Sequence, residues 1–174
     1  MNKILLGSVL LLTGCESYYN TAHSDVYLTT NTGLGQKIGE VSFMDTPSGL
    51  LVNVDLHNLS EGEHGFHIHE NPDCGVMVDA QGKVQPALKA GGHYDPDKTG
   101  HHMGPNHKDG HRGDLPVLTV PKNGEIKTSF TVQNLRVKEI KNRSIMVHAG
   151  GDNYSDEPLP LGGGGLRIAC GLIK

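Results

Sequence analysis

Histidines dominate the part of the chain whose residue types could carry chemistry. Eight of the eleven histidines lie between positions 64 and 111, and His148 follows a strand-like run at 144–147. His67 and His69 stand two residues apart in an alternating segment, so on a β-strand both rings would project from the same face. Imidazole is the commonest protein ligand for metals, and two rings on one face beside a histidine-rich loop favour a metal site over surface histidines.

The same region holds further nitrogen ligands and a carboxylate. His93, His102, His111 and Asp114 are spread over a stretch rich in glycine and proline. Imidazole nitrogens with a single carboxylate suit zinc or copper, because calcium and magnesium prefer oxygen ligands. The formal net charge of −4 gives no support to nucleic acid as a partner, and an anionic substrate would need local positive charge.

The elements that must position these ligands are β-strands. Strand-like runs with a period of two, rather than 3.6, occur at 26–30, 38–43, 50–56, 65–69, 115–120, 126–132, 144–148 and 166–173. A helical turn is expected only at 135–142. Two long stretches, 71–114 and 149–165, lack periodicity and need a metal and a disulfide to order them. We therefore predict an all-β fold, an antiparallel β-sandwich or flattened barrel with two long loops forming the metal site.

The N-terminus is typical of an exported protein. Lys3 precedes an apolar run at 4–12 that is too short to span a bilayer. The run ends in Leu12-Thr13-Gly14-Cys15, which resembles the bacterial lipoprotein processing box, in which the cysteine becomes the lipidated first residue. A plain secretory cleavage site is the alternative interpretation. Glu16 follows the cysteine. An aspartate at this position would resemble an inner-membrane retention signal, so with glutamate we expect sorting to the outer membrane.

These features divide the chain into three parts. Residues 1–14 are expected to be a signal peptide, 15–24 a lipidated tether and 25–174 one folded domain. The protein would then lie on the periplasmic side of the bacterial envelope, with the membrane as a partner through the lipidated cysteine. If that cysteine carries lipid, Cys74 and Cys170 remain as one pair in an oxidising compartment.

Five motifs follow one another along the chain: His64-Gly65-Phe66-His67-Ile68-His69, Gly91-Gly92-His93-Tyr94-Asp95-Pro96, His111-Arg112-Gly113-Asp114-Leu115-Pro116, Met146-Val147-His148 and Arg167-Ile168-Ala169-Cys170-Gly171. Together they resemble the Cu,Zn superoxide dismutase family. The Gly150-Gly151-Asp152-Asn153 run and the glycine tract at 162–165 resemble its bacterial periplasmic branch. The resemblance covers essentially all of the chain after the tether, and it implies a Greek-key arrangement of the strands.

The resemblance implies two adjacent metal sites, with one copper and one zinc ion per subunit. Copper would be bound by His67, His69, His93 and His148, and zinc by His93, His102, His111 and Asp114. His93 would bridge the two metals through its two ring nitrogens. Zinc with four protein ligands keeps no open position, as is typical of a structural site.

Two further residues take roles from the resemblance. Asp152 would orient His67 and His102 through their free ring N–H groups, the alternative being a solvated loop aspartate. Arg167 would attract and orient superoxide beside copper, the alternative being an arginine on a strand surface. His93 would join Arg167 in catalysis by releasing copper on reduction and carrying a proton to the product.

The implied function is dismutation of superoxide to dioxygen and hydrogen peroxide at a copper site bridged to structural zinc. A homodimer is expected, because the loop at 72–96 is more like that of dimeric bacterial members. The alternative function is a non-catalytic periplasmic lipoprotein that binds or delivers copper or zinc, which would use the same ligands but leave Arg167 without a purpose. A zinc hydrolase is disfavoured because Asp114 fills the fourth zinc position.

Overall fold

The computed structural model describes residues 20–174, so the expected signal peptide and Cys15 lie outside the described residues. The elements in chain order are β1 (Thr21–Thr30), β2 (Gly33–Thr46), β3 (Gly49–Leu56), β4 (Gly62–His64), β5 (Phe66–His69), β6 (Met77–Val78), β7 (Val84–Gln85), the 3-10 helix η1 (Leu88–Ala90), β8 (Leu118–Val120), β9 (Ile126–Val132), α1 (Val137–Ile140), β10 (Ser144–His148), the 3-10 helix η2 (Leu161–Gly163) and β11 (Arg167–Leu172). Within this part of the chain, no helix is long and apolar enough to cross a membrane.

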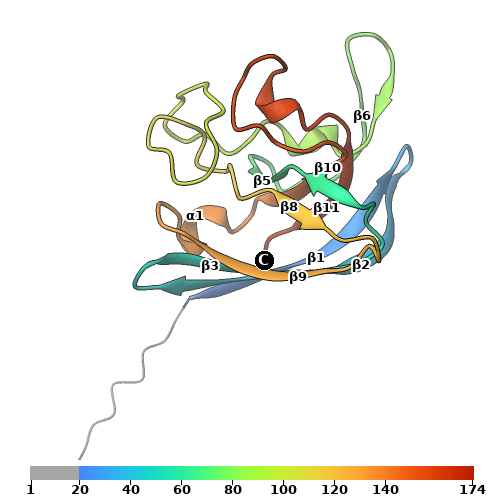
Figure 1. Cartoon of the computed structure of the whole chain (residues 1–174). Helices are drawn as coiled ribbons and strands as arrows, with labels where there is room; N and C mark the ends of the chain where they lie inside the picture. Colours follow the sequence, from blue (N-terminus) through green and yellow to red (C-terminus); the bar gives the residue numbers. More distant parts are fainter. Residues whose placement is uncertain (1–19) are drawn as a thin grey trace, which may run out of the picture.

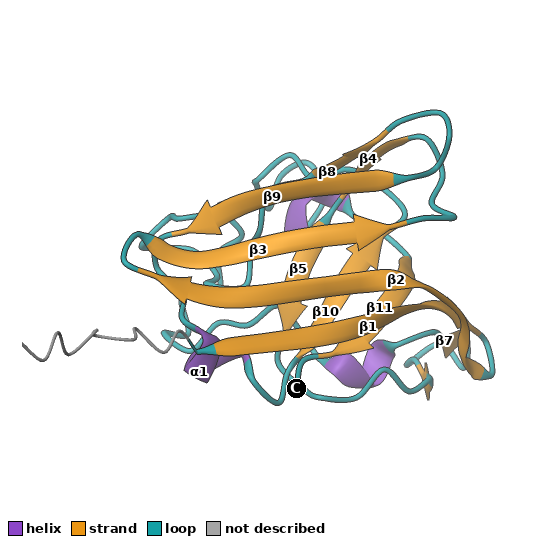
Figure 2. Ribbon diagram, turned by 90° about the horizontal axis from the view of Figure 1, so that it is seen from below, coloured by secondary structure: helices purple, strands orange, loops and turns teal. Residues whose placement is uncertain are grey.

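The main sheet of the described domain is antiparallel and has seven strands in the order β5-β10-β11-β1-β2-β3-β9. Figure 2 shows β1, β2, β3 and β9 side by side in one layer, with β5, β10 and β11 behind them, because the sheet curls over on itself. Two short pairs, β4 with β8 and β6 with β7, form separate two-stranded sheets. Figure 1 shows the long loops gathered on the side away from β3 and β9. The predicted all-β sandwich with long loops is confirmed.

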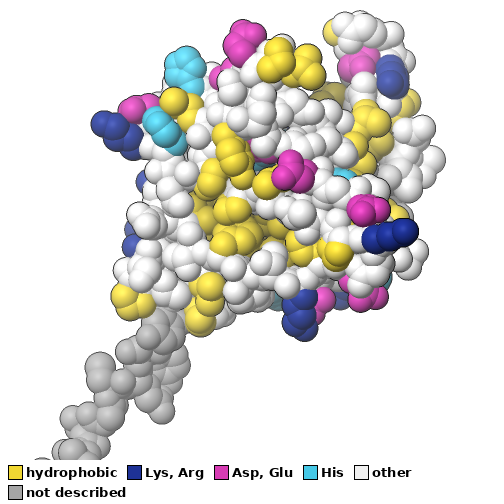
Figure 3. Space-filling view, viewed as in Figure 1, with side chains coloured by type: hydrophobic (Ala, Val, Ile, Leu, Met, Phe, Trp, Pro, Cys, Tyr) yellow, Lys and Arg dark blue, Asp and Glu magenta, His cyan; other side chains and the backbone are white. Residues whose placement is uncertain are grey.

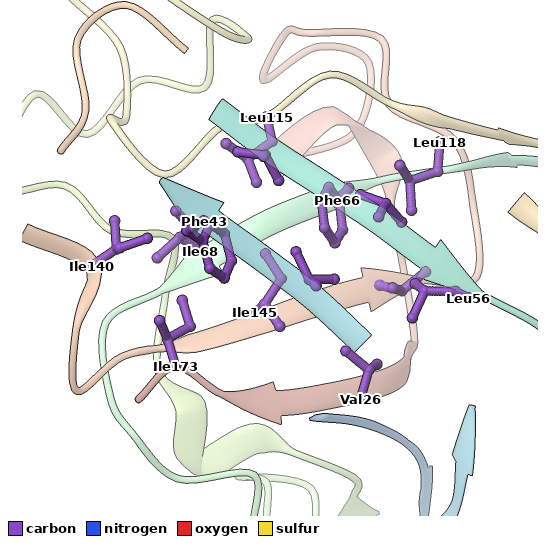
Figure 4. Close-up of a cluster of buried hydrophobic side chains, with 14 of the residues drawn as sticks. Val26, Phe43, Leu56, Phe66, Ile68, Leu115, Leu118, Ile140, Ile145 and Ile173 are labelled. Carbon is purple, nitrogen blue, oxygen red and sulfur yellow. The ribbon is translucent and has the colours of Figure 1, made fainter. Parts of the chain in front are cut away.

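The hydrophobic core lies between the two layers. In β3 the side chains of Leu50, Val52, Val54 and Leu56 are buried, whereas Asn53 and Asp55 between them are exposed. Burying one face of each strand removes apolar area from water, which is the main force that closes the sandwich. Figure 4 shows side chains from both layers meeting in the core, among them Val26, Phe43, Leu56, Phe66, Ile68 and Ile145.

Strands β5 and β10 differ from the outer strands because both of their faces are buried. All four residues of β5 and all five of β10 are buried. Phe66 and Ile68 belong to the core, so the alternating His67 and His69 project to the opposite face, toward the long loops. This second buried face carries the candidate site.

One predicted boundary is wrong. Residues 21–24, expected in the tether, form the start of β1 and pair with residues 41–44 of β2. Ala22 and Ser24 are buried there. Small and polar residues give no clear apolar alternation, and the pairing with β2 determines their strand conformation. The helical turn expected at 135–142 is confirmed as α1.

Candidate metal centre

Four histidines from three segments meet on the loop-covered face of β5 and β10. His67 and His69 come from β5, His148 ends β10, and His93 is held against His69 by an isolated β-bridge. All four are buried, and each offers a ring nitrogen within 4.8 Å of those of the others. The rings of His67 and His93 stack with centroids 3.9 Å apart, and His69 Nε2 lies 3.4 Å from His148 Nε2. The structure thus brings together the four residues predicted as copper ligands.

A second cluster shares two of these histidines. His67 and His93 lie with His102 and Asp114 so that one ligand atom of each is within 4.8 Å of the others. Asp114 Oδ1 is 2.9 Å from His93 Nδ1, and Asp114 Oδ2 is 2.9 Å from His102 Nδ1. His111, predicted as a zinc ligand, lies at the edge of the cluster with its Nδ1 3.5 Å from Asp114 Oδ1. His67, predicted only for copper, enters this cluster because its ring stacks on that of His93.

Backbone hydrogen bonds fasten the loop at 71–114 to β5. Tyr94 N donates to Ile68 O at 2.8 Å, Ile68 N donates to Gly113 O at 2.9 Å, and Gly113 N donates to Tyr94 O at 2.8 Å. A Cβ at position 113 would collide with Ile68 O, so this close approach requires glycine. Each of these three residues stands next to a predicted ligand in the sequence: Ile68 between His67 and His69, Tyr94 after His93, and Gly113 before Asp114. The bonds therefore place ligands from the strand and from the loop next to one another.

The outer ring nitrogens of two predicted copper ligands are held by carbonyl groups. His69 Nδ1 donates to Gly91 O at 3.0 Å, and His148 Nδ1 donates to Gly165 O at 3.3 Å. A neutral imidazole that carries its proton on Nδ1 keeps its lone pair on Nε2. The lone pairs of these two rings therefore point toward each other, into the first cluster.

Asp152 connects the two clusters from the outside. Its Oδ2 accepts a hydrogen bond from His67 Nε2 and its Oδ1 accepts one from His102 Nε2, both at 2.7 Å. Gly162 allows the loop at 149–165 to close over this carboxylate, because a Cβ there would collide with Asp152 Oδ1. Asp152 therefore lies where it can orient one predicted copper ligand and one predicted zinc ligand.

The inner ring nitrogens fit a metal-binding role. Four buried ring nitrogens have no hydrogen-bond partner of acceptable geometry among the described residues: His67 Nδ1, His93 Nε2, His102 Nδ1 and His111 Nδ1. A buried polar atom without a partner is costly and rare in native proteins. Because imidazole nitrogens with one carboxylate match the preferences of copper and zinc, the residues present fit these two metals.

Burial keeps most of these imidazoles neutral. It lowers the pKa of His93 to about 3, and it lowers the pKa values of His69 and His148 well below the ordinary value for histidine. The neutral form is the one that binds a metal ion. His102 behaves differently: burial lowers its pKa, but its close contacts with the carboxylates of Asp114 and Asp152 outweigh the burial and raise the pKa to about 9.

The two carboxylates remain ionised. Burial raises the pKa of Asp114, but the nearby ring nitrogens of His102, His111 and His93 outweigh the burial and hold that pKa well below the usual range. The pKa of Asp152 is also lowered, since the bonds from His102 and His67 outweigh its burial. The site therefore sets the neutral imidazoles of His69, His93 and His148 beside two negative charges, a combination suited to divalent cations.

Arg167 lies at the start of β11, with its guanidinium bound to the loop at 71–114. It donates from NH1 to Ala87 O at 2.7 Å and from NH2 to Gly91 O at 2.6 Å. Gly91 O also accepts the bond from His69, so one carbonyl joins the arginine to a predicted copper ligand. Burial lowers the pKa of Arg167, but a guanidinium keeps its charge at neutral pH.

A disulfide fastens the same loop to β11. Cys74 and Cys170 are bonded, with Cα atoms 5.9 Å apart and a sequence separation of 96. The expected pairing is confirmed. Because Cys170 follows Arg167 in the same strand, the bond fixes the loop beside the guanidinium that it holds.

Two residues of the loop at 149–165 carry contacts that the sequence did not predict. Asp156 Oδ2 accepts a hydrogen bond from His102 N at 2.9 Å, which holds the backbone of a predicted zinc ligand. The Tyr154 hydroxyl accepts one from Val117 N at 2.9 Å and so ties the loop to the segment before β8. An acidic or aromatic residue in a polar loop belongs to no periodic pattern, so no sequence signal marked either contact.

Fold and site together define a class of protein, an antiparallel β-sandwich metalloprotein in which a histidine site suited to copper adjoins a histidine–carboxylate site suited to zinc. The profile of the family described as Copper/zinc superoxide dismutase (SODC) matches residues 37–173, and the chain belongs to this family. It is a superoxide dismutase, an oxidoreductase that uses copper and zinc.

The similarity to individual relatives extends over the whole chain. The Cu-Zn superoxide dismutase of Brucella abortus biovar 1 (strain 9-941) is 45% identical over 175 residues, which cover 100% of both chains. That of Escherichia coli (strain K12) is 43% identical over 175 residues, again 100% of both chains. Among solved structures, Cu/Zn superoxide dismutase from Brucella abortus has a TM-score of 0.85 and 47% identity, covering 89% of this chain and 100% of that one. Monomeric copper, zinc superoxide dismutase from Salmonella enterica has a TM-score of 0.78 and 46% identity, with the same 89% and 100% coverage.

Proposed function

We propose that this superoxide dismutase binds its metals through two overlapping ligand sets: copper through His67, His69, His93 and His148, and zinc through His93, His102, His111 and Asp114. The observation that carries the proposal is the set of buried inner ring nitrogens without hydrogen-bond partners, which includes those of His67 and His102. The outer nitrogens of these two rings are held by Asp152, and those of the neighbouring His69 and His148 rings are held by carbonyls. Each ring is thereby oriented before a metal arrives. His93 suits both sites because its Nδ1 lies beside Asp114 while its Nε2 has no partner.

Bound copper supplies a one-electron redox couple, and bound zinc holds the loop. Arg167 contributes local positive charge on a protein whose net charge is −4. Its guanidinium, fixed by two carbonyls, would attract superoxide and orient it near His69. His93 would hold a proton at Nε2 and donate it to the reduced substrate.

The test is superoxide consumption by residues 16–174 remetallated with copper and zinc, with the metal content measured on the same sample. We expect fast copper-dependent turnover that is lost on chelation and sharply lowered by His93→Gln, which cannot bridge two metals. Full turnover of His93→Gln would contradict the role of His93. Stoichiometric copper and zinc without turnover would instead favour a metal-delivery protein.

We further propose that the protein is exported and anchored by a lipid on Cys15 at the periplasmic side of the bacterial envelope. The apolar run at 4–12 and the processing box that follows it support this proposal. Since β1 begins at Thr21, the tether would comprise residues 15–20. Glu16 favours the outer membrane.

The lipid anchor is tested by mass spectrometry of the N-terminal peptide from the membrane fraction, which should carry acyl chains on Cys15. Cys15→Ser should release the enzyme into the soluble fraction. An unmodified cysteine, or a Cys15→Ser variant that stays in the membrane, would contradict the anchor. Density-gradient separation of the two membranes tests the sorting.

We also propose a homodimer in which the β6–β7 hairpin contacts a second copy. Met77, Val78 and Val84 on this hairpin are 43%, 58% and 38% exposed. Figure 3 shows apolar side chains exposed along it at the upper right, and grouped apolar surface favours a protein contact. Sedimentation equilibrium should give a dimer that Val78→Lys dissociates. A monomer, as described for the Salmonella enterica relative, would contradict this proposal.

A further inference from the structure

One arginine outside both clusters contacts the residues that follow two predicted copper ligands. Arg143 immediately precedes β10, and its NH1 donates a hydrogen bond to Glu70 O at 2.9 Å. Its guanidinium carbon lies 3.6 Å from the centroid of the Tyr94 ring. Glu70 follows His69 and Tyr94 follows His93, so one side chain spans the two segments that carry these ligands.

The two segments are also joined by hydrogen bonds from His69 Nδ1 to Gly91 O and from Gly92 N to the Glu70 carboxylate, and by a short run of backbone contacts. Glu70 N donates to Gly92 O at 3.0 Å, and an isolated bridge pairs His69 with His93. The centroids of these two imidazole rings lie 5.0 Å apart. So short a pairing has little cooperativity of its own, and the spacing of the rings therefore depends also on side-chain contacts at its end.

The contact uses properties that arginine combines and lysine lacks. While NH1 bonds to Glu70, Nε donates to Glu139 O at 2.7 Å, so the guanidinium is held along two edges. The guanidinium carbon lies over the Tyr94 ring, which is only 7% exposed. Attraction between a cation and an aromatic face strengthens as both lose water. Lysine would keep the charge but lose the planar stacking and the fork of donors.

We propose that Arg143 is a positioning residue for the copper site, which clamps Glu70 to Tyr94 and so fixes the spacing of His69 and His93. The proposal rests on the ligand set given above. Arg143 makes no hydrogen bond to either imidazole and acts through the residues next to them. Loosening the clamp lets the two rings move apart, which speeds copper release, whereas the zinc ligands that follow position 100 keep their own contacts.

The test compares Arg143→Lys, Tyr94→Leu and Tyr94→Phe in protein loaded with copper and zinc. We measure the rates of copper and of zinc transfer to a chelator and the electron paramagnetic resonance spectrum of Cu(II). Arg143→Lys and Tyr94→Leu should release copper about tenfold faster, as expected for the loss of a supporting contact around a ligand, with an altered copper hyperfine splitting. Zinc release should change much less, because three of the four proposed zinc ligands lie outside the clamp. Tyr94→Phe keeps the aromatic face and should match the parent. Arg136→Lys is the matched control, because the Arg136 guanidinium bonds to the carbonyls of Gln133 and Leu135.

A double variant should separate this clamp from general loosening. Arg143→Lys combined with Tyr94→Leu should release copper little faster than either single variant, because both remove the same contact. Equal acceleration of copper and zinc release would overturn the proposal, and so would a parent-like copper spectrum in a less stable protein. If Arg143→Lys does not fold, the contrast between Tyr94→Leu and Tyr94→Phe decides the question. Parent-like copper affinity of His69→Ala would contradict the ligand set itself.

Discussion

Replacing Asp152 by asparagine removes one negative charge while keeping the size and shape of the side chain. In the structure both carboxylate oxygens accept hydrogen bonds, Oδ2 from His67 Nε2 and Oδ1 from His102 Nε2 and Tyr154 N. Asparagine offers one acceptor oxygen and one donating amide group. Because two donors meet at Oδ1, we expect the amide oxygen to take that position and the NH2 group to face the N–H of His67.

The size of the effect follows from these bonds. The substitution loses the hydrogen bond from His67 to a charged acceptor, and the bonds from His102 and Tyr154 N then end on a neutral oxygen. Of these three bonds, those from His67 and His102 orient metal ligands and enter the estimate. Hydrogen bonds to charged groups contribute about 1.5–3 kcal/mol and neutral ones about 1 kcal/mol, so the total loss is roughly 2–5 kcal/mol. Divided between one copper ligand and one zinc ligand, this loss corresponds to roughly tenfold weaker binding of each metal.

Competition with a chelator measures both affinities. The apoprotein and its Asp152→Asn variant are titrated with zinc and then with copper at constant pH and salt. Asp109→Asn provides the matched control, because it makes the same charge change at an exposed position of the loop at 71–114. Unchanged affinities for both metals in Asp152→Asn would refute the reasoning that this carboxylate orients His67 and His102.

Three further perturbations test other parts of the molecule. Replacing both Cys74 and Cys170 by serine should lower the free energy of unfolding, measured in urea, by about 4.7 kcal/mol on the chain-entropy model, because the disulfide joins residues 96 positions apart. An unchanged free energy of unfolding would contradict this expectation. Arg167→Ala should slow superoxide consumption about tenfold at low ionic strength, and stopped-flow rates that keep the parent's salt dependence would exclude steering by this residue. The raised pKa of His102 contributes stability to the apoprotein that is complete below the ordinary value of 6.5 and is lost as the pH rises through about 9. Unfolding free energies of the apoprotein should therefore decline across that window, and the same decline in His102→Gln would show that another group is responsible.

The sequence by itself determined the strand pattern and the identity of the chemical groups. The alternating run at 50–56 became β3, because exposure along a strand repeats every two residues. The spacing of His67 and His69 placed both rings on one face for the same reason, and the family motifs predicted an all-β superoxide dismutase. These signals are local, so they can be recognised without knowledge of the fold.

Only the tertiary structure decided which distant groups meet. Arg143 reaches the carbonyl of Glu70, 73 positions away, and nothing near either residue in the sequence predicts that bond. The start of β1 at Thr21, ahead of its predicted position, depends on pairing with β2 rather than on any apolar pattern. His111 lies at the edge of the second cluster while His67 enters it, because the fold of the loop against β5 sets their distances to Asp114. Contacts of this kind are determined by the curl of the sheet and the register of the loops, where tertiary packing overrides local preference.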